Sequence, residues 1–287
     1  AFAQSIPRLF AGLRSIVATE AGHIFIFPGT GTGGWEATIA NTLSKGDRVL
    51  ACRHGVFSDK WIRLCEAFGL IVDVIECDWT GPADPTLIEA ALRADQNQAI
   101  KAVLATHNET ATGVRSDLKA IRESIDRAGH GALFFVDGVS SIASMDFQMD
   151  AWGIDAAVTG SQKGLMLPAG LAIVAVSDKA MEAGKTADLP RFFFDFKQMA
   201  QMTHQGGFPY TPPMQLLAGL KHSVDLLLTE GLDAVFSRHF KMGEGVRQAA
   251  AAWNLDLCCE DLQYASDTVT TIMVPEGFNA DRLVEHA

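Results

Sequence analysis

Three short stretches of this 287-residue chain combine residue types that could do chemistry. The first is Phe27-Pro-Gly-Thr-Gly-Thr-Gly-Gly-Trp-Glu36, in which Gly29, Gly31 and Gly34 satisfy the GxGxxG pattern. Where such a turn opens a helix, exposed N–H groups, threonine hydroxyls and the positive end of the helix dipole can hold a phosphate group. Because glycine turns between strands and helices are common, this stretch alone is equally typical of a tight turn without a ligand.

The other two stretches offer a carboxylate and an amine. Asp137 follows the apolar run that ends at Val136, and Lys163 stands among small and polar residues in Thr159-Gly-Ser-Gln-Lys-Gly164. A carboxylate that keeps a pyridine nitrogen protonated makes a pyridoxal ring an electron sink, and a lysine with a partly deprotonated amine forms an imine with an aldehyde. Taken singly, Asp137 is more typical of a helix cap, and Lys163 of a surface lysine.

The three motifs taken together favour the functional interpretation over the structural one. The phosphate cradle, the carboxylate and the lysine come in chain order, and each follows a predicted strand of the same sheet. Ligands of open α/β sheets bind at the carboxyl ends of the strands, so we expect the three groups to meet there. The sequence therefore predicts a pyridoxal 5′-phosphate site, with Asp137 facing the ring nitrogen and Lys163 bonded to the cofactor.

The elements that must position these groups follow from the hydrophobic pattern. Short apolar runs alternate with amphipathic stretches, as in parallel strands joined by helical crossovers. Since the runs are almost continuously apolar, we expect an α/β fold with a mostly parallel sheet covered by helices on both faces. The expected strands are 23–27, 48–52, 71–76, 100–106, 132–137, 155–160 and 171–177, and the expected helices are 35–43, 58–68, 85–93, 117–128, 214–228 and 232–253.

The same pattern predicts two domains. Residues 1–250 form a large cofactor-binding domain, and residues 251–287 begin a smaller C-terminal α+β domain with a strand at 268–274. We expect the sequence to be truncated at both ends, because Ala1 opens inside a helical pattern and residues 286–287 close one just after it starts.

Composition excludes several classes of function. The formal charge is −11, so the surface should repel nucleic acid. The longest apolar runs are far shorter than the roughly 20 residues of a membrane-spanning helix, so no membrane role is expected. The five cysteines show no CxxC spacing, so we predict neither a metal site nor a disulfide framework, and a reducing cytoplasm fits best.

The motifs also resemble a known family, the fold type I, class V pyridoxal-phosphate aminotransferases, and within it the branch of serine–, alanine– and aspartate–glyoxylate aminotransferases. The resemblance covers essentially the whole chain. It is carried by Gly29-Thr-Gly-Thr-Gly-Gly-Trp-Glu-Ala37, Thr106-His-Asn-Glu-Thr-Ala-Thr-Gly113, Val136-Asp-Gly-Val-Ser-Ser141, Ser161-Gln-Lys163 and Tyr210-Thr-Pro-Pro213.

The resemblance implies a role for each matching position. It places Asp137 at the ring nitrogen and makes Lys163 the Schiff-base lysine. Phe57 stands where the family stacks an aromatic ring on the cofactor, often a Trp, and Thr110 where it bonds the phenolic oxygen. The residues implied at the cofactor phosphate are Thr30, Gly31, Thr32, Gln162 and, from the neighbouring subunit of a homodimer, Thr211.

The implied activity is a transamination between an amino acid and glyoxylate, giving glycine and a 2-keto acid. The donor is serine or aspartate, or else alanine, and the sequence does not choose among them. Arg191 and the aromatic residues of 192–196 and 208–210 are candidates for the donor pocket, but packing at a subunit contact explains them equally well. The family's substrate-carboxylate arginine is expected beyond residue 287.

Three alternatives stay open. An NAD(P)-dependent oxidoreductase would use the GxGxxG turn, with Arg53 reading a 2′-phosphate, but it leaves Lys163 and Asp137 without a role. A pyridoxal-phosphate lyase or desulfurase shares the expected fold; desulfurases, however, usually carry His where this chain has Gln162. A non-catalytic scaffold of the same fold becomes serious only if the expected arginine is truly absent.

Overall fold

Strand residues alternate between two hydrophobic cores, one on each face of a single sheet. In β7 (Leu133–Asp137), Phe134 and Val136 pack into one core and Leu133 and Phe135 into the other. This period of two follows from the pleat, which turns successive side chains to opposite faces. Because every position of β7 is buried, the strand reads as one apolar run, as the sequence pattern indicates.

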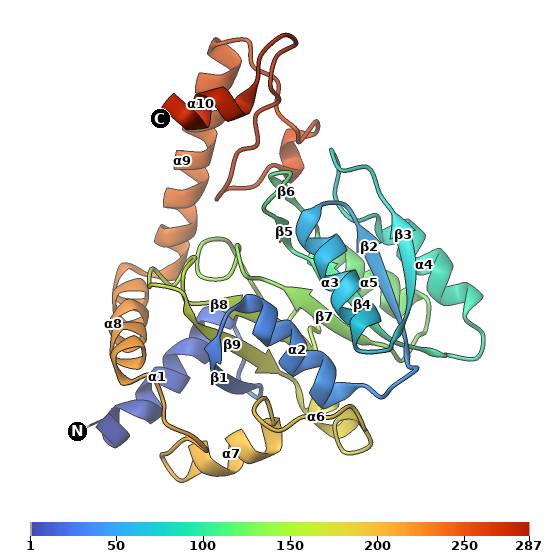
Figure 1. Ribbon diagram of the computed structural model, residues 1–287, viewed down its shortest axis with the longest axis vertical. Coiled ribbons are helices and arrows are strands. Elements are labelled where there is room, and N and C mark those ends of the chain that lie inside the picture. The colour runs from blue at the N-terminus through green and yellow to red at the C-terminus, as the bar shows by residue number, and fades with distance from the viewer. Residues whose placement is uncertain (1, 287) are drawn as a thin grey trace.

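The computed structural model describes residues 2–286 and contains one seven-stranded sheet, ordered β1-β9-β8-β7-β4-β2-β3 (Figure 1). Its other strands are β1 (His23–Gly29), β2 (Arg48–Arg53), β3 (Ile71–Glu76), β4 (Ile100–Thr106), β8 (Ala156–Gly160) and β9 (Gly170–Val176). All seven expected strands are present. A two-stranded sheet joins β5 (Asn108–Glu109) to β6 (Val114–Arg115).

Strand β9 is antiparallel to both of its neighbours, whereas the pairs from β8 to β3 are parallel. Only residues 161–169 connect β8 to β9, and a parallel crossover needs about a dozen residues or more. The chain therefore turns straight back. The predicted mostly parallel sheet is confirmed, and the reversal places the Lys163 loop at the carboxyl end of β8.

Helices cover both faces of the sheet, as expected. On one face lie α1 (Phe2–Val17), α4 (Pro85–Ala94), α5 (Leu118–Arg127) and α8 (Met214–Glu230). On the other lie α2 (Gly31–Thr42), α3 (Val56–Ala67), α6 (Asp178–Ala183) and α7 (Phe196–His204). The predicted fold class is thereby confirmed. No helix of residues 2–286 is both long and apolar enough to span a membrane.

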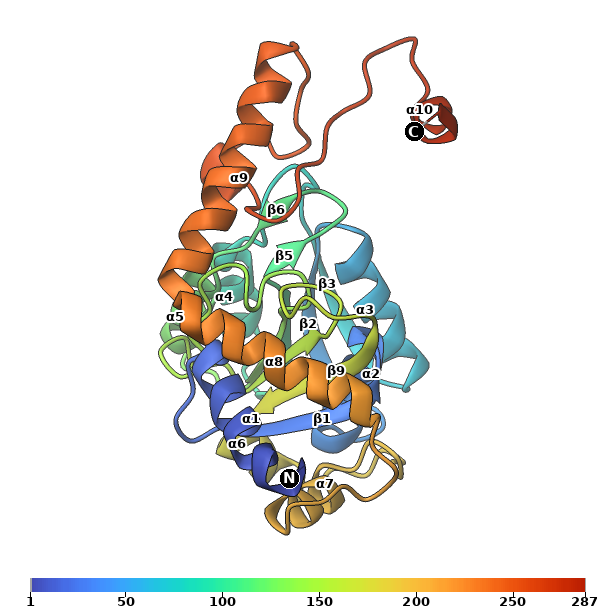
Figure 2. The ribbon, with the colours of Figure 1, turned by 90° about the vertical axis from the view of Figure 1, so that its left-hand side faces the viewer.

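Helix α9 (Leu232–Ala252) continues from α8 and rises above the sheet, and the chain then leads to α10 (Ala280–His286), which stands apart in Figure 2. A 3-10 turn at Leu262–Tyr264 lies between them. The predicted strand at 268–274 is wrong: its only ladder contact among the described residues is the single bridge Leu257↔Ile272. Such isolated pairing does not sustain a strand. The domain boundary near residue 250, close to the end of α9, stays a prediction.

Candidate active site

The carboxyl ends of the parallel strands bring together residues that are distant in the chain. Asp137 is the last residue of β7 and pairs with Thr106, the last residue of β4. Since Leu133 and Phe135 face the core beneath α2 and α3, the alternation turns Asp137 to the same side. The side chain of Asp137 is 5% exposed, so the sheet edge holds a buried carboxyl group.

The surroundings of Asp137 favour its protonated form in the absence of a cationic partner. Burial raises the pKa of the carboxyl to about 7, and the charge of Glu109 adds to the rise. A hydrogen bond from the Val139 N–H (2.9 Å) and the nearby charge of Lys163 lower the pKa. The Trp35 indole acts in the same direction, although its Nε1 makes no hydrogen bond of normal geometry.

Lys163 lies in the short loop between β8 and β9, which Ser161 holds in shape. The Ser161 hydroxyl donates to the Pro168 carbonyl (2.7 Å) and accepts from the Leu171 N–H (3.1 Å). Lys163 is exposed on this loop. It lines a cavity of about 420 Å³ together with Thr110. Further lining comes from Ser140 after β7, from Arg238 and His239 on α9 and from Thr268 near the C-terminus.

The predicted phosphate cradle forms the start of α2. Thr30 is the N-cap residue; its backbone is extended, and its side chain makes no capping bond. The first N–H groups of a helix have no partner within it, so those of Gly31 and Thr32 are available to an anion. A Cβ on Gly31 would lie 2.6 Å from Val139, and one on Gly34 2.5 Å from Val158. The glycines thus let the start of α2 lie directly against the loop after β7 and against the middle of β8.

Phe57 and Thr110 lie near the carboxyl ends of the strands, Phe57 on α3 and Thr110 directly after β5. Phe57 is half-buried in the first turn of α3, and Thr110 follows β5. The Thr110 hydroxyl hydrogen-bonds Ser140 Oγ (3.0 Å). The structure therefore brings Asp137, Lys163 and Thr110 to one edge of the sheet, with Phe57 beside them on α3.

Gln162 and Thr211 are the two remaining residues expected at the cofactor phosphate. Gln162 Oε1 is buried without a hydrogen-bond partner, close to Gly160. Thr211 is exposed in the segment that joins α7 to α8. Its role was expected from the neighbouring subunit, so it stays a prediction.

Other buried polar atoms at this edge fit a bound ligand. Trp35 Nε1 and Thr106 Oγ1 have no hydrogen-bond partner among the described residues. Unpaired buried groups cost free energy that a polar ligand can recover. With Asp137 beside them and a free helix start nearby, these residues fit a phosphorylated pyridine. Sequence reasoning gave no role to Trp35, Thr106 or Glu109, although all three lie in the motifs that it used.

The hydrogen bonds of Arg191 support the interpretation that it packs within the chain. Its guanidinium donates to the main-chain carbonyls of Ala40 (3.0 Å), Ala187 (3.2 Å) and Leu189 (3.3 Å), so it fastens the segment before α7. Phe194 lies against the start of α2, with its ring 3.1 Å from where a Cβ on Gly33 would stand.

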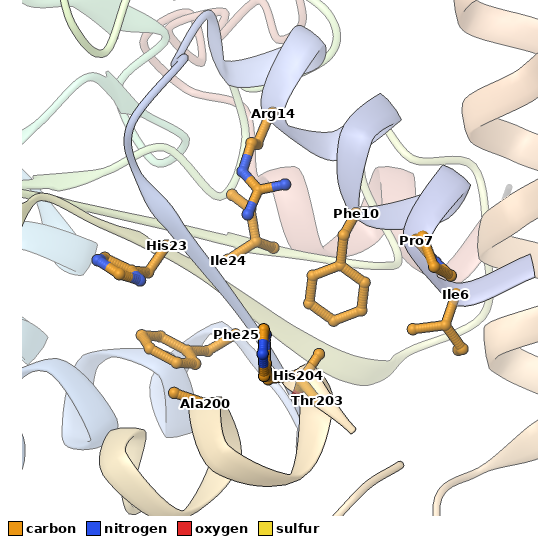
Figure 3. Close-up of a pocket in the computed structure, with 10 residues that line it drawn as sticks. All are labelled: Ile6, Pro7, Phe10, Arg14, His23, Ile24, Phe25, Ala200, Thr203 and His204. Atoms are coloured by element: carbon orange, nitrogen blue, oxygen red, sulfur yellow. The ribbon is translucent and has the colours of Figure 1, made fainter. Parts of the chain in front are cut away.

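A separate cavity of about 360 Å³ is lined by Phe10 and Arg14 of α1, by His23 of β1 and by His204 of α7 (Figure 3). It sits at the amino end of β1, whereas the cradle follows the carboxyl end of that strand. This cavity is therefore no part of the candidate site.

The fold is that of the fold type I aminotransferases. The alanine–glyoxylate aminotransferase of Nostoc sp. has a TM-score of 0.93 and 27% identity, over 99% of this chain and 75% of its own. The chain is 52% identical to the L-aspartate–glyoxylate aminotransferase of Paracoccus denitrificans, over 100% of this chain and 72% of that protein. It is 49% identical to the serine–glyoxylate aminotransferase of Methylorubrum extorquens, over 97% and 71%. Residues 11–267 match the class V aminotransferase family, and the chain belongs to that family.

Proposed function

We propose that this chain catalyses transamination between an L-amino acid and glyoxylate, giving glycine and a 2-keto acid, with pyridoxal 5′-phosphate as cofactor. The observation that carries the proposal is that Asp137 ends β7 while the Lys163 loop follows β8, the neighbouring parallel strand, so both lie at the same edge of the sheet. Relatives at 44–52% identity are named serine– and aspartate–glyoxylate aminotransferases, which supports glyoxylate as the acceptor.

Each site residue has a defined task in this reaction. The cofactor, when bound, supplies an electron sink that stabilises negative charge at the amino acid's α-carbon. With the cofactor bound, the Asp137 carboxylate would hold a proton on the ring nitrogen, and Lys163 Nζ would hold the cofactor between turnovers and accept the proton that leaves the amino acid's α-carbon. The phosphate is held by the start of α2, through Thr30, Gly31 and Thr32, with Gln162 beside them.

Two further residues orient the ring. Phe57 covers one face, and Thr110 binds the phenolic oxygen. The Thr110 hydroxyl donates to Ser140 Oγ (3.0 Å), which orients the side chain; to donate to the phenolic oxygen, its single proton would turn from Ser140 toward the ring.

A homodimer is part of the proposal, with Thr211 of one subunit completing the phosphate site of the other. It is supported by exposed apolar side chains, among them Phe192 (86%), Met166 (57%) and Val56 (51%). All five cysteines are free, which supports a cytoplasmic location.

Two competing functions receive less support. For dinucleotide binding, Arg53 would have to be available, but it pairs with Asp59 (3.0 Å) and with Glu76. For desulfuration a thiol would have to reach the substrate, yet none of the five cysteines, all within the described part of the chain, lines the cavity beside Lys163.

The test uses purified protein supplied with pyridoxal 5′-phosphate. We expect a visible absorption band that borohydride removes, with the reduced cofactor attached to the Lys163 peptide in a mass spectrum. Serine, aspartate and alanine, each supplied with glyoxylate, then identify the donor through the keto acid formed. A colourless protein that binds a nicotinamide dinucleotide would contradict the proposal.

A further inference from the structure

Glu109 is a fully buried carboxylate to which the proposed reaction gives no task. Its side chain is 0% exposed, and it forms no ion pair with any described residue. Its oxygens accept hydrogen bonds from three main-chain N–H groups instead. Oε2 accepts from Phe57 (3.1 Å) and Ser58 (2.9 Å), and Oε1 accepts from Ala111 (3.1 Å).

These bonds explain how a charge is tolerated without a cation. Helix α3 begins after Gly55, which has no side chain to cap it, so the first N–H groups of the helix lack partners. Glu109 reaches this helix start from another part of the chain and meets the positive end of its dipole. A buried carboxylate that accepts several N–H bonds avoids most of the cost of losing water.

The contact between Glu109 and the start of α3 also depends on the absence of a side chain at Gly55. A Cβ on Gly55 would lie 2.2 Å from Glu109 Cγ and 2.3 Å from Cδ, so only glycine leaves room for the carboxylate. The φ of Gly55 is 169°, which is extended backbone open to any residue. Space, and not backbone conformation, therefore requires glycine at this position.

The two segments that Glu109 joins are those that carry the ring-contacting residues. Phe57 lies in the first turn of α3, and Thr110 lies between Glu109 and Ala111. One carboxylate thus fixes both segments through their main chains.

We propose that Glu109 is a positioning residue that sets the separation of Phe57 and Thr110 and so holds the cofactor ring between them. The inference rests on the proposed function, from which the roles of Phe57 and Thr110 come. It predicts that moving the carboxylate disturbs cofactor binding, even though Glu109 itself does not touch the ring.

Two variants test this by different routes. Glu109→Gln keeps the size of the side chain but turns an N–H donor toward main-chain N–H groups, whereas Gly55→Ala keeps the charge and displaces it. For both we expect the dissociation constant of pyridoxal 5′-phosphate to rise by about tenfold. We also expect the circular dichroism band of the bound cofactor to change, because that band reports the orientation of the ring.

The matched control is Asp117→Ala, which removes the cap of α5 on the opposite face of the sheet, where Asp117 accepts from the Ala120 N–H (2.9 Å). It should lower thermal stability and leave cofactor affinity and the dichroism band unchanged.

The outcomes separate the two proposals. If wild-type protein binds the cofactor and both variants bind it equally well with the same dichroism band, Glu109 is only a helix cap and this inference is overturned. If wild-type protein binds no pyridoxal phosphate, the proposed function fails and the inference falls with it. Should Glu109→Gln not fold, Gly55→Ala decides alone, since its carboxylate remains.

Discussion

Asp137 ends β7, and Lys163 lies in the loop after the neighbouring strand β8: burial raises the pKa of the Asp137 carboxyl to about 7, and the Lys163 charge opposes that rise. The native carboxyl therefore keeps its proton up to about pH 7, whereas the unfolded chain releases it near pH 4. Between these values the native state binds more protons than the unfolded state. The free energy of unfolding of the cofactor-free protein must then fall as the pH rises through this window and level off above pH 7.

Asp137→Asn removes this dependence, because an amide does not titrate and its oxygen can still accept the Val139 N–H. Relative to wild type, the cofactor-free variant should gain roughly 3 kcal/mol of stability between pH 5 and pH 8. Urea unfolding at the two pH values measures the gain. The same variant should lose turnover, since no carboxylate faces the ring nitrogen. A difference from wild type that does not change with pH would show that the carboxyl titrates normally.

Lys163→Ala should abolish turnover while leaving the stability of the fold almost unchanged. Lys163 is exposed and forms no ion pair within residues 2–286, so its removal should change the free energy of unfolding by about 0.5 kcal/mol or less. Turnover should fall at least about 10²–10⁴-fold, the range lost with a proton-transferring group. Lys119→Ala, an exposed lysine on α5, is the control and should keep full activity. Equal activity in the two variants would remove Lys163 from the reaction.

Features of the fold and the candidate site could be predicted from the sequence where they depend on local patterns, but not where they depend on contacts between distant residues. The seven strands could be predicted because each is a buried run bounded by turn residues, and parallel strands bring their carboxyl ends to one edge. Asp137 and Lys163 follow from that rule. The reversal of β9 was overlooked, although the short linker that carries Lys163 already indicates it.

Glu109 could not have been found in this way. Its side chain accepts hydrogen bonds from Phe57 and Ser58 in the first turn of α3, which lie 52 and 51 positions earlier in the chain. No local sequence pattern indicates a contact over that separation. The prediction of a strand at 268–274 was wrong because it relied on the local pattern alone. Its residues suit an extended chain, but a strand forms only where a neighbour supplies a continuous ladder, and Leu257 pairs at one position alone.

Gly34→Ala tests whether the start of α2 must lie directly against β8. The added methyl group would stand 2.5 Å from Val158 Cγ1 and 3.5 Å from Val174, in the core between α2 and the sheet. We expect a loss of about 1–3 kcal/mol in the free energy of unfolding, measured with urea, and weaker cofactor binding.

Gly245→Ala is the matched control within α9, because a Cβ there meets nothing within 4 Å. It should stabilise the protein by roughly 0.5–1 kcal/mol through helix propensity and leave cofactor binding unchanged. If Gly34→Ala stabilises the protein to the same extent, α2 is free to move and the close approach is not required.

The thiols should differ sharply in reactivity. The neighbouring Cys52 thiol lowers the pKa of the half-buried Cys77 thiol, while burial raises the pKa of Cys65 to about 12 and also raises that of Cys258. The thiolate is the reactive form. Iodoacetamide at pH 7.5 should therefore label Cys77 first, then Cys258, and Cys65 only after unfolding, as followed by peptide mass spectrometry. Cys52→Ala should slow labelling of Cys77 and Cys52→Ser should restore it, because serine keeps a donor; earlier labelling of Cys258 in wild type would contradict the assignment.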